Sequence, residues 1–215
     1  MIDVSKKKRI VLKLGTSTLT HKTGKLNIRR MTNLVRILSD LHNEGRELLL
    51  VSSGAVGMGV GKLNLSERPK DTPSKQAAAA VGQCELMHIY DDMFAKYNVT
   101  VAQILLTRAT LTNERLPHVQ NTIGRLLEMG VIPIVNENDT VAIDELELEI
   151  GENDSLSATV AAAVGADLLV ILSDINGLYS ADPRTNADAQ VIREVHKIDA
   201  VSYTHLRAHE TDQYL

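Results

Sequence analysis

A lysine stands near the end of the first apolar run of the chain, just before a glycine and two hydroxyl residues. The segment is Lys13, Leu14, Gly15, Thr16 and Ser17. An unpaired ammonium is costly in apolar surroundings, so we expect Lys13 to face a polar cleft at the strand end. Gly15 allows a sharp turn, after which N–H groups and hydroxyls outline an anion site. A lysine that snorkels along the sheet edge is the alternative explanation.

A second apolar run ends in a glycine-rich turn. Residues 51–59 read Val-Ser-Ser-Gly-Ala-Val-Gly-Met-Gly and include Ser53. Such a turn can expose the N-terminal amides of a helix to a carboxylate or phosphate. The sequence matches neither a P-loop nor a strict dinucleotide fingerprint, and a plain strand-to-helix turn explains it equally well.

Amides and carboxylates cluster at two later turns. Residues 136–139 (Asn-Glu-Asn-Asp) follow an apolar run, and residues 151–154 (Gly-Glu-Asn-Asp) precede a helical pattern. These side chains suit the ammonium and carboxylate of an amino acid, and they can also orient lysines or a metal ion. Turn and capping preferences explain each Asn-Asp pair separately, with Asp154 or Ser155 as the expected helix cap.

The last polar segment follows the run 168–172 and begins with Ser173 and Asp174. Gly177, Asp182 and Pro183 lie further along it. These three residues disfavour an immediate helix, so the segment is predicted to be a long loop.

Alternating strands and helices must position these turns. Five runs rich in Val, Ile and Leu lack polar alternation, which predicts buried parallel strands at 10–14, 48–51, 99–106, 131–135 and 168–172. Helical spacing or composition marks 31–41, 74–82, 123–127 and 156–164. Residues 141–150 alternate with period two, as in a half-exposed strand or hairpin. The order predicts a single α/β domain.

Composition narrows the range of partners. A net charge of -4, 3% aromatic residues and no Trp among 215 residues argue against a nucleic-acid partner. The single Cys84 excludes an intrachain disulfide. No apolar run reaches the roughly 18 residues of a membrane span, and no secretory segment follows the charged N-terminus. We therefore expect no membrane association and a cytoplasmic location.

Taken in order, the four polar segments resemble the amino acid kinase family, in particular its glutamate 5-kinase branch. The resemblance runs from about residue 9 to 199 and includes residues 74–83 and 105–108. It implies a three-layer α/β/α sandwich with a mainly parallel, twisted sheet. It also implies transfer of the γ-phosphoryl group of ATP, with Mg²⁺, to the side-chain carboxylate of L-glutamate. The product is L-glutamyl 5-phosphate, the first intermediate of proline synthesis; feedback by proline and a homo-oligomeric intact enzyme are further implications.

The resemblance also implies a role for each site residue. Lys13 and Asp154 are the catalytic pair, in which Lys13 neutralises the transferred phosphoryl group and Asp154 orients the lysine. Glutamate is expected to contact Ser53, Asp139 and Asn153. The nucleotide is expected to contact Lys13, Gly15, Ser173 and Asp174, and no protein ligand to a metal is expected.

The resemblance ends after Asp199. We therefore expect an incomplete kinase domain at 1–199 and a non-matching tail of foreign or out-of-frame origin at 200–215. His205 and His209 have helical i, i+4 spacing, but a solvated tail is a better explanation than a zinc site, which needs more ligands. Two alternatives stay open: another carboxylate or carbamate kinase of the same fold, and a catalytically silent ligand-binding fragment.

Overall fold

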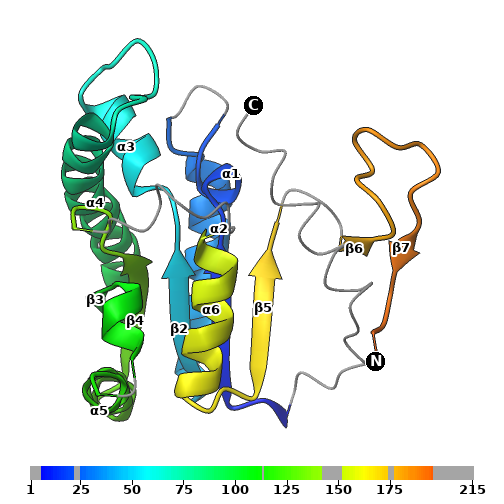
Figure 1. The fold of residues 1–215 in the computed structure, drawn as a ribbon. Coiled ribbons are helices and arrows are strands. Elements are labelled where there is room, and N and C mark those ends of the chain that lie inside the picture. The colour runs from blue at the N-terminus through cyan, green and yellow to red at the C-terminus, as the bar shows by residue number, and fades with distance from the viewer. Residues whose placement is uncertain (1–5, 22–24, 113, 142–151, 174–176, 196–215) are drawn as a thin grey trace.

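The computed structural model describes residues 6–21, 25–112, 114–141, 152–173 and 177–195. Strands and helices alternate along most of this length (Figure 1). The larger elements are β1 (Arg9–Leu14), α2 (Ile28–Asn43), β2 (Glu47–Ser52), α3 (Ala55–Lys62), α4 (Thr72–Ala95), β3 (Thr100–Leu106), α5 (Leu116–Glu128), β4 (Val131–Glu137), α6 (Glu152–Ala163) and β5 (Leu168–Leu172). The shorter ones are α1 (Thr16–Leu19), a 3-10 helix (Arg108–Leu111), β6 (Leu178–Tyr179) and β7 (Val191–Ile192).

Five strands form one parallel sheet in the order β3-β4-β2-β1-β5. All five predicted apolar runs are strands of this sheet, which confirms the α/β prediction. Parallel pairing brings the carboxyl ends of neighbouring strands to one edge. The polar turns that follow β1, β2, β4 and β5 therefore start from the same edge of the sheet.

Alternation along the strands separates two apolar layers. Even-numbered positions such as Leu12 and Leu50 pack in one buried cluster with residues of α2 and α4. Odd-numbered positions such as Val11, Leu49 and Val51 pack in another cluster with residues of α5 and α6. Figure 1 shows α6 and α2 on opposite sides of the sheet. The predicted three-layer sandwich is confirmed.

The structure corrects the sequence prediction at several element ends. Helix α6 begins at Glu152, so Asp154 and Ser155 lie inside its first turn and neither is its cap. Strand β4 continues through Glu137, so Asn136 belongs to the strand and not to the turn. Helix α4 has 24 residues instead of the short predicted stretch.

Two further predictions differ in how far the structure tests them. The predicted loop after β5 contains the antiparallel pair β6–β7, where Leu178 pairs with Ile192. The predicted hairpin lies outside the described residues except for Val141, and so does the tail at 200–215. The proposed boundary near residue 199 therefore stays a prediction.

No helix in the described part of the chain combines the length and apolar character that a membrane crossing requires.

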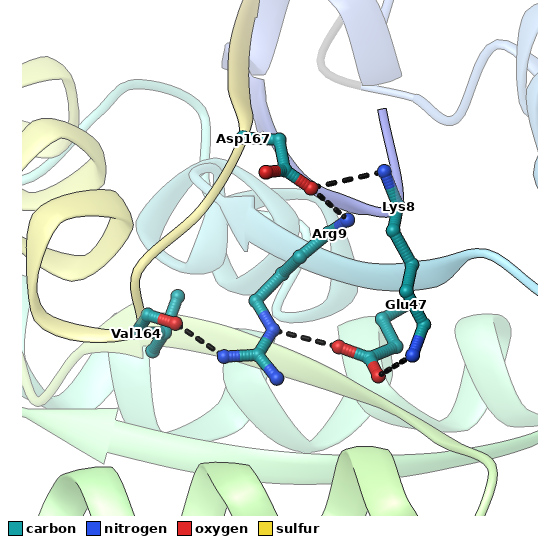
Figure 2. A network of polar contacts seen from close by, with 5 residues as sticks. All are labelled: Lys8, Arg9, Glu47, Val164 and Asp167. Carbon is teal, nitrogen blue, oxygen red and sulfur yellow. Dashed lines mark hydrogen bonds and ion pairs between the residues drawn. The ribbon is translucent and has the colours of Figure 1, made fainter. Parts of the chain in front are cut away.

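A polar network fastens the opposite edge of the sheet, where the strands begin (Figure 2). The Asp167 carboxylate accepts the backbone N–H groups of Lys8 at 3.0 Å and Arg9 at 2.9 Å. The Arg9 side chain donates to Glu47 at 2.7 Å and to the Val164 carbonyl. These contacts join β1 to β2 and to the turn that leads from α6 into β5.

The hydrogen bonds in this network stabilise ionised carboxylates. The backbone N–H of Arg9, followed by that of Lys8, lowers the pKa of Asp167. The Arg9 guanidinium likewise lowers the pKa of Glu47. A carboxyl group with a lowered pKa in the folded state contributes stability above its unfolded pKa of about 4, and that stability is lost as the pH falls through the folded value.

Asp167→Asn tests this network, since asparagine keeps an acceptor oxygen but cannot ionise. We expect a lower melting temperature at pH 7, and the difference from the unmodified chain should shrink as the pH falls below about 4. Thermal unfolding between pH 7 and pH 3 measures this. Asp91→Asn, on the exposed surface of α4, is the control; a deficit for Asp167→Asn that stays constant across the range would contradict the explanation.

Candidate functional site

Lys13 forms an ion pair across the sheet edge. It is an odd-numbered residue of β1, so the alternation directs it toward the layer that contains α6. Its Nζ lies 2.6 Å from Oδ1 of Asp154, in the first turn of α6. The two side chains are 16% and 28% exposed. Lys13 thus meets a carboxylate at the strand end, and the predicted catalytic pair is in direct contact.

A second contact joins the glycine-rich turn to α6. Ser53 follows β2, and its Oγ accepts a hydrogen bond from Nδ2 of Asn153 at 2.5 Å. The backbone N–H of Ser53 donates to the Leu14 carbonyl at 3.0 Å, which fixes the turn against the end of β1. Gly54 has φ 108°, a left-handed conformation that favours glycine, and α3 begins at the next residue. The chain therefore turns here from strand directly into helix.

These contacts gather four of the predicted residues into one group, the edge cluster: Lys13, Ser53, Asn153 and Asp154. Segments separated by a hundred residues meet in it. The Oδ1 atom of Asn153 is buried and has no hydrogen-bond partner in the described part of the chain. A buried acceptor left in this state favours a donor such as an amino-acid ammonium. The cluster offers one cation and several polar groups, which suits a charged amino acid.

Asp139 lies on the same edge, one strand further along. It follows β4, which is the neighbour of β2 in the sheet. The backbone N–H of Asn138 donates to the Leu106 carbonyl at 2.7 Å, so this turn is held against the end of β3. The side chain of Thr140 donates to Oδ1 of Asn138 at 2.5 Å. Topology places Asp139 beside the edge cluster.

The residues predicted to bind the nucleotide follow β1 and β5. Leu14 and Leu172 are register partners at the ends of these strands, and Gly15 and Ser173 come directly after them. The Thr18 hydroxyl donates to the Leu172 carbonyl at 3.4 Å, which connects α1 to the end of β5. Gly15 and Ser173 therefore flank the Lys13 side of the edge. Asp174 lies outside the described residues.

Sequence reasoning missed the helices that support this edge. Helix α3, which starts at the Ser53–Gly54 turn, packs closely on α4. A Cβ atom at Gly59 would collide with the backbone of Ala78, and one at Gly82 would collide with the backbone of Ala55. Two glycines in separate helical segments were the only signal in the sequence, and glycine in a helix has several explanations.

No group of three or more His, Cys, Asp or Glu side chains in the described residues could hold a metal ion. Protein sites for Mg²⁺ in kinases generally rely on one or two carboxylates together with substrate phosphates. The described residues thus fit a metal that arrives with a nucleotide better than one held in a cage of side chains.

Comparison with known proteins gives two kinds of result. The family model described as "Amino acid kinase family" matches residues 8–212. Among curated proteins, glutamate 5-kinase of Clostridium perfringens is 56% identical over 194 residues, covering 89% of this chain and 72% of the relative. Glutamate 5-kinase of Moorella thermoacetica is 54% identical over 192 residues, covering 89% of this chain and 50% of the relative.

Solved structures show the same fold at low sequence identity. UMP kinase from Ureaplasma parvum has a TM-score of 0.57 and 16% identity, covering 95% of this chain and 87% of its own. UMP kinase from Bacillus anthracis has a TM-score of 0.58 and 16% identity, with 94% and 83% coverage. These similarities concern the fold alone.

The close approach of α3 to α4 predicts opposite effects for two glycine substitutions. Gly82→Ala should destabilise the protein by about 1–3 kcal/mol, because the added methyl group pushes α3 away from α4. Gly124→Ala, in α5 with open space around it, should be neutral or stabilise by up to about 1 kcal/mol through helix propensity. Urea unfolding measures both values. Equal effects would show that the two helices do not pack as described.

Proposed function

The chain belongs to the amino acid kinase family, and we propose that it transfers the terminal phosphoryl group of ATP to the side-chain carboxylate of L-glutamate. The relatives named above as glutamate 5-kinases support this substrate. The geometric observation that carries the proposal is the contact of Lys13 with Asp154 at the same edge as the Ser53–Asn153 pair. The reaction gives L-glutamyl 5-phosphate, the first intermediate of proline synthesis.

The acceptor needs no general base. A glutamate side chain has a reference pKa near 4.3, so it is already a carboxylate at neutral pH and can attack phosphorus directly. The main obstacle is repulsion between this anion and the phosphates. Lys13 is suited to neutralise charge on the transferred group, and Asp154 is suited to keep the ammonium at the strand end. Positioning and charge therefore carry the catalysis.

We assign glutamate to the β2–β4 side of the edge. Ser53, Asn153 and Asp139 there offer a hydroxyl, an amide and a carboxylate, which complement the carboxylate and ammonium groups of an amino acid. The nucleotide is assigned to the β1–β5 side, where Gly15 and Ser173 follow neighbouring strands. The two ligands then meet at Lys13.

We further propose Mg²⁺ as the metal, held by the phosphate oxygens. When bound, it neutralises phosphate charge in the manner general to phosphoryl transfer. A cytoplasmic location, self-association and feedback by proline complete the proposal and rest on the family resemblance. The net charge of -4 agrees with small-molecule substrates rather than a nucleic-acid partner.

Substrate choice can be tested on this chain with an ATP-dependent hydroxamate assay, in which hydroxylamine traps the acyl phosphate. We expect L-glutamate to give clearly more product than aspartate or N-acetylglutamate. Preference for N-acetylglutamate would favour another carboxylate kinase of the same fold. Calorimetric binding of glutamate or nucleotide without product would favour a silent ligand-binding fragment.

Substitutions can separate the catalytic and binding roles. Lys13→Met, which keeps the apolar stem, should lower kcat by about 10²–10³-fold, because one charge-stabilising donor is lost. Its effect on the KM for glutamate should be small. Asp139→Ala should raise the KM for glutamate about tenfold or more with a smaller change in kcat, since a charged contact to the substrate is lost. Parallel changes in both parameters for both variants would contradict these assignments.

A further inference from the structure

Helix α4 makes two buried polar contacts with the sheet. Oε1 of Gln83 accepts a hydrogen bond from Nδ2 of Asn136 in β4 at 2.8 Å. The hydroxyl of Tyr90 lies 2.9 Å from Oγ of Ser52 in β2. Gln83 is 8% exposed, Asn136 2%, and the other two are fully buried. Burial raises the pKa of Tyr90, so its hydroxyl stays protonated at neutral pH.

Both contacts fall at equivalent places in neighbouring strands. The register of β2 with β4 pairs Leu50 with Ile134 and Val51 with Val135. Ser52 and Asn136 are the next residues in line. Ser53 follows at once in one strand, and Asp139 lies three residues on in the other. The two contacts therefore lie at the points where the chain leaves the sheet for the proposed glutamate site.

Gln83 and Tyr90 are seven residues apart, which is about two helical turns, so both lie on the sheet-facing side of α4. Leu86 lies between them on the same side, and it is fully buried. One rigid helix thus contacts both strand ends at a fixed spacing.

Packing alone does not require these polar groups. Their surroundings include the apolar cluster of Leu86, Phe94 and Ile134. Nε2 of Gln83 is buried and has no hydrogen-bond partner among the described residues, a state that costs stability. Hydrogen bonds are directional, whereas apolar contacts tolerate sliding. The two contacts are therefore better suited to fixing a geometry than to adding stability.

We propose that Gln83 and Tyr90 are positioning residues that set the separation between the Ser53 turn and the Asn138–Asp139 turn, and so select the length of the acceptor amino acid. The inference rests on the proposed function, because these two turns are assigned to glutamate. Glutamate and aspartate differ by one methylene, and a difference of that size supports roughly 10–200-fold discrimination. A site whose two sides can shift loses part of that discrimination.

The test compares two polar deletions with an apolar control on the same helix. Gln83→Met and Tyr90→Phe each keep the shape of the side chain and remove one hydrogen bond. Leu86→Met changes the packing between them and conserves volume. For each variant, the ratio of kcat/KM for glutamate to that for aspartate is measured together with the KM for ATP and the melting temperature.

We expect the preference for glutamate over aspartate to fall about 3–10-fold in both polar variants. It should stay within twofold of the unmodified chain in Leu86→Met, and the KM for ATP should stay within twofold in all three. A purely structural role would instead lower the rate with both amino acids in parallel, following the melting temperature. That result, or an unchanged preference in either soluble polar variant, overturns the inference.

The unmodified chain distinguishes this failure from a failure of the proposed function. If it shows no preference for glutamate, the proposed function is wrong and the inference is overturned with it. If it prefers glutamate and the polar variants keep that preference, only the inference is overturned.

Discussion

A lysine ammonium at the end of an apolar parallel strand needs a negative partner, because the surrounding side chains cannot solvate its charge. In this protein the partner is Asp154, 2.6 Å away in the first turn of α6. The pairing requires α6 to begin above the end of β1, and this also brings Asn153 to Ser53. One ion pair therefore determines where three distant segments meet, and removing either member would leave the other charge partly buried without compensation.

The two faces of the sheet have different tasks at this edge. The α6 face supplies Asp154 and Asn153, which contact Lys13 and Ser53 directly. The α4 face contributes no charge; it contacts Ser52 and Asn136, the residues before the two acceptor turns. Close packing of α3 on α4 at Gly59 and Gly82 extends that support to the start of α3. The far edge is closed by the Arg9, Glu47 and Asp167 network, so the strands are fixed at both ends.

Much of this arrangement could be predicted from the sequence, since apolar runs without polar alternation are typical of buried parallel strands. Lys13 was conspicuous because it interrupts such a run. The start of α6 was misplaced, because an Asp-Ser pair before an apolar stretch fits a helix cap, whereas in the structure Asp154 contacts Lys13. Gln83 and Tyr90 were not found, because a polar residue in a helix has no sequence signal for the strand it contacts. The individual site roles came from family resemblance and stay proposals.

The central claim is that the acceptor and the phosphates meet at Lys13. A crystal structure of this chain with L-glutamate and a non-hydrolysable ATP analogue tests it most directly. The account predicts the Lys13 ammonium within hydrogen-bonding distance of a terminal phosphate oxygen, with the glutamate side-chain carboxylate facing that phosphate from the Ser53 side. A nucleotide bound away from the ends of β1 and β5, or a glutamate bound away from Ser53 and Asn153, would contradict it.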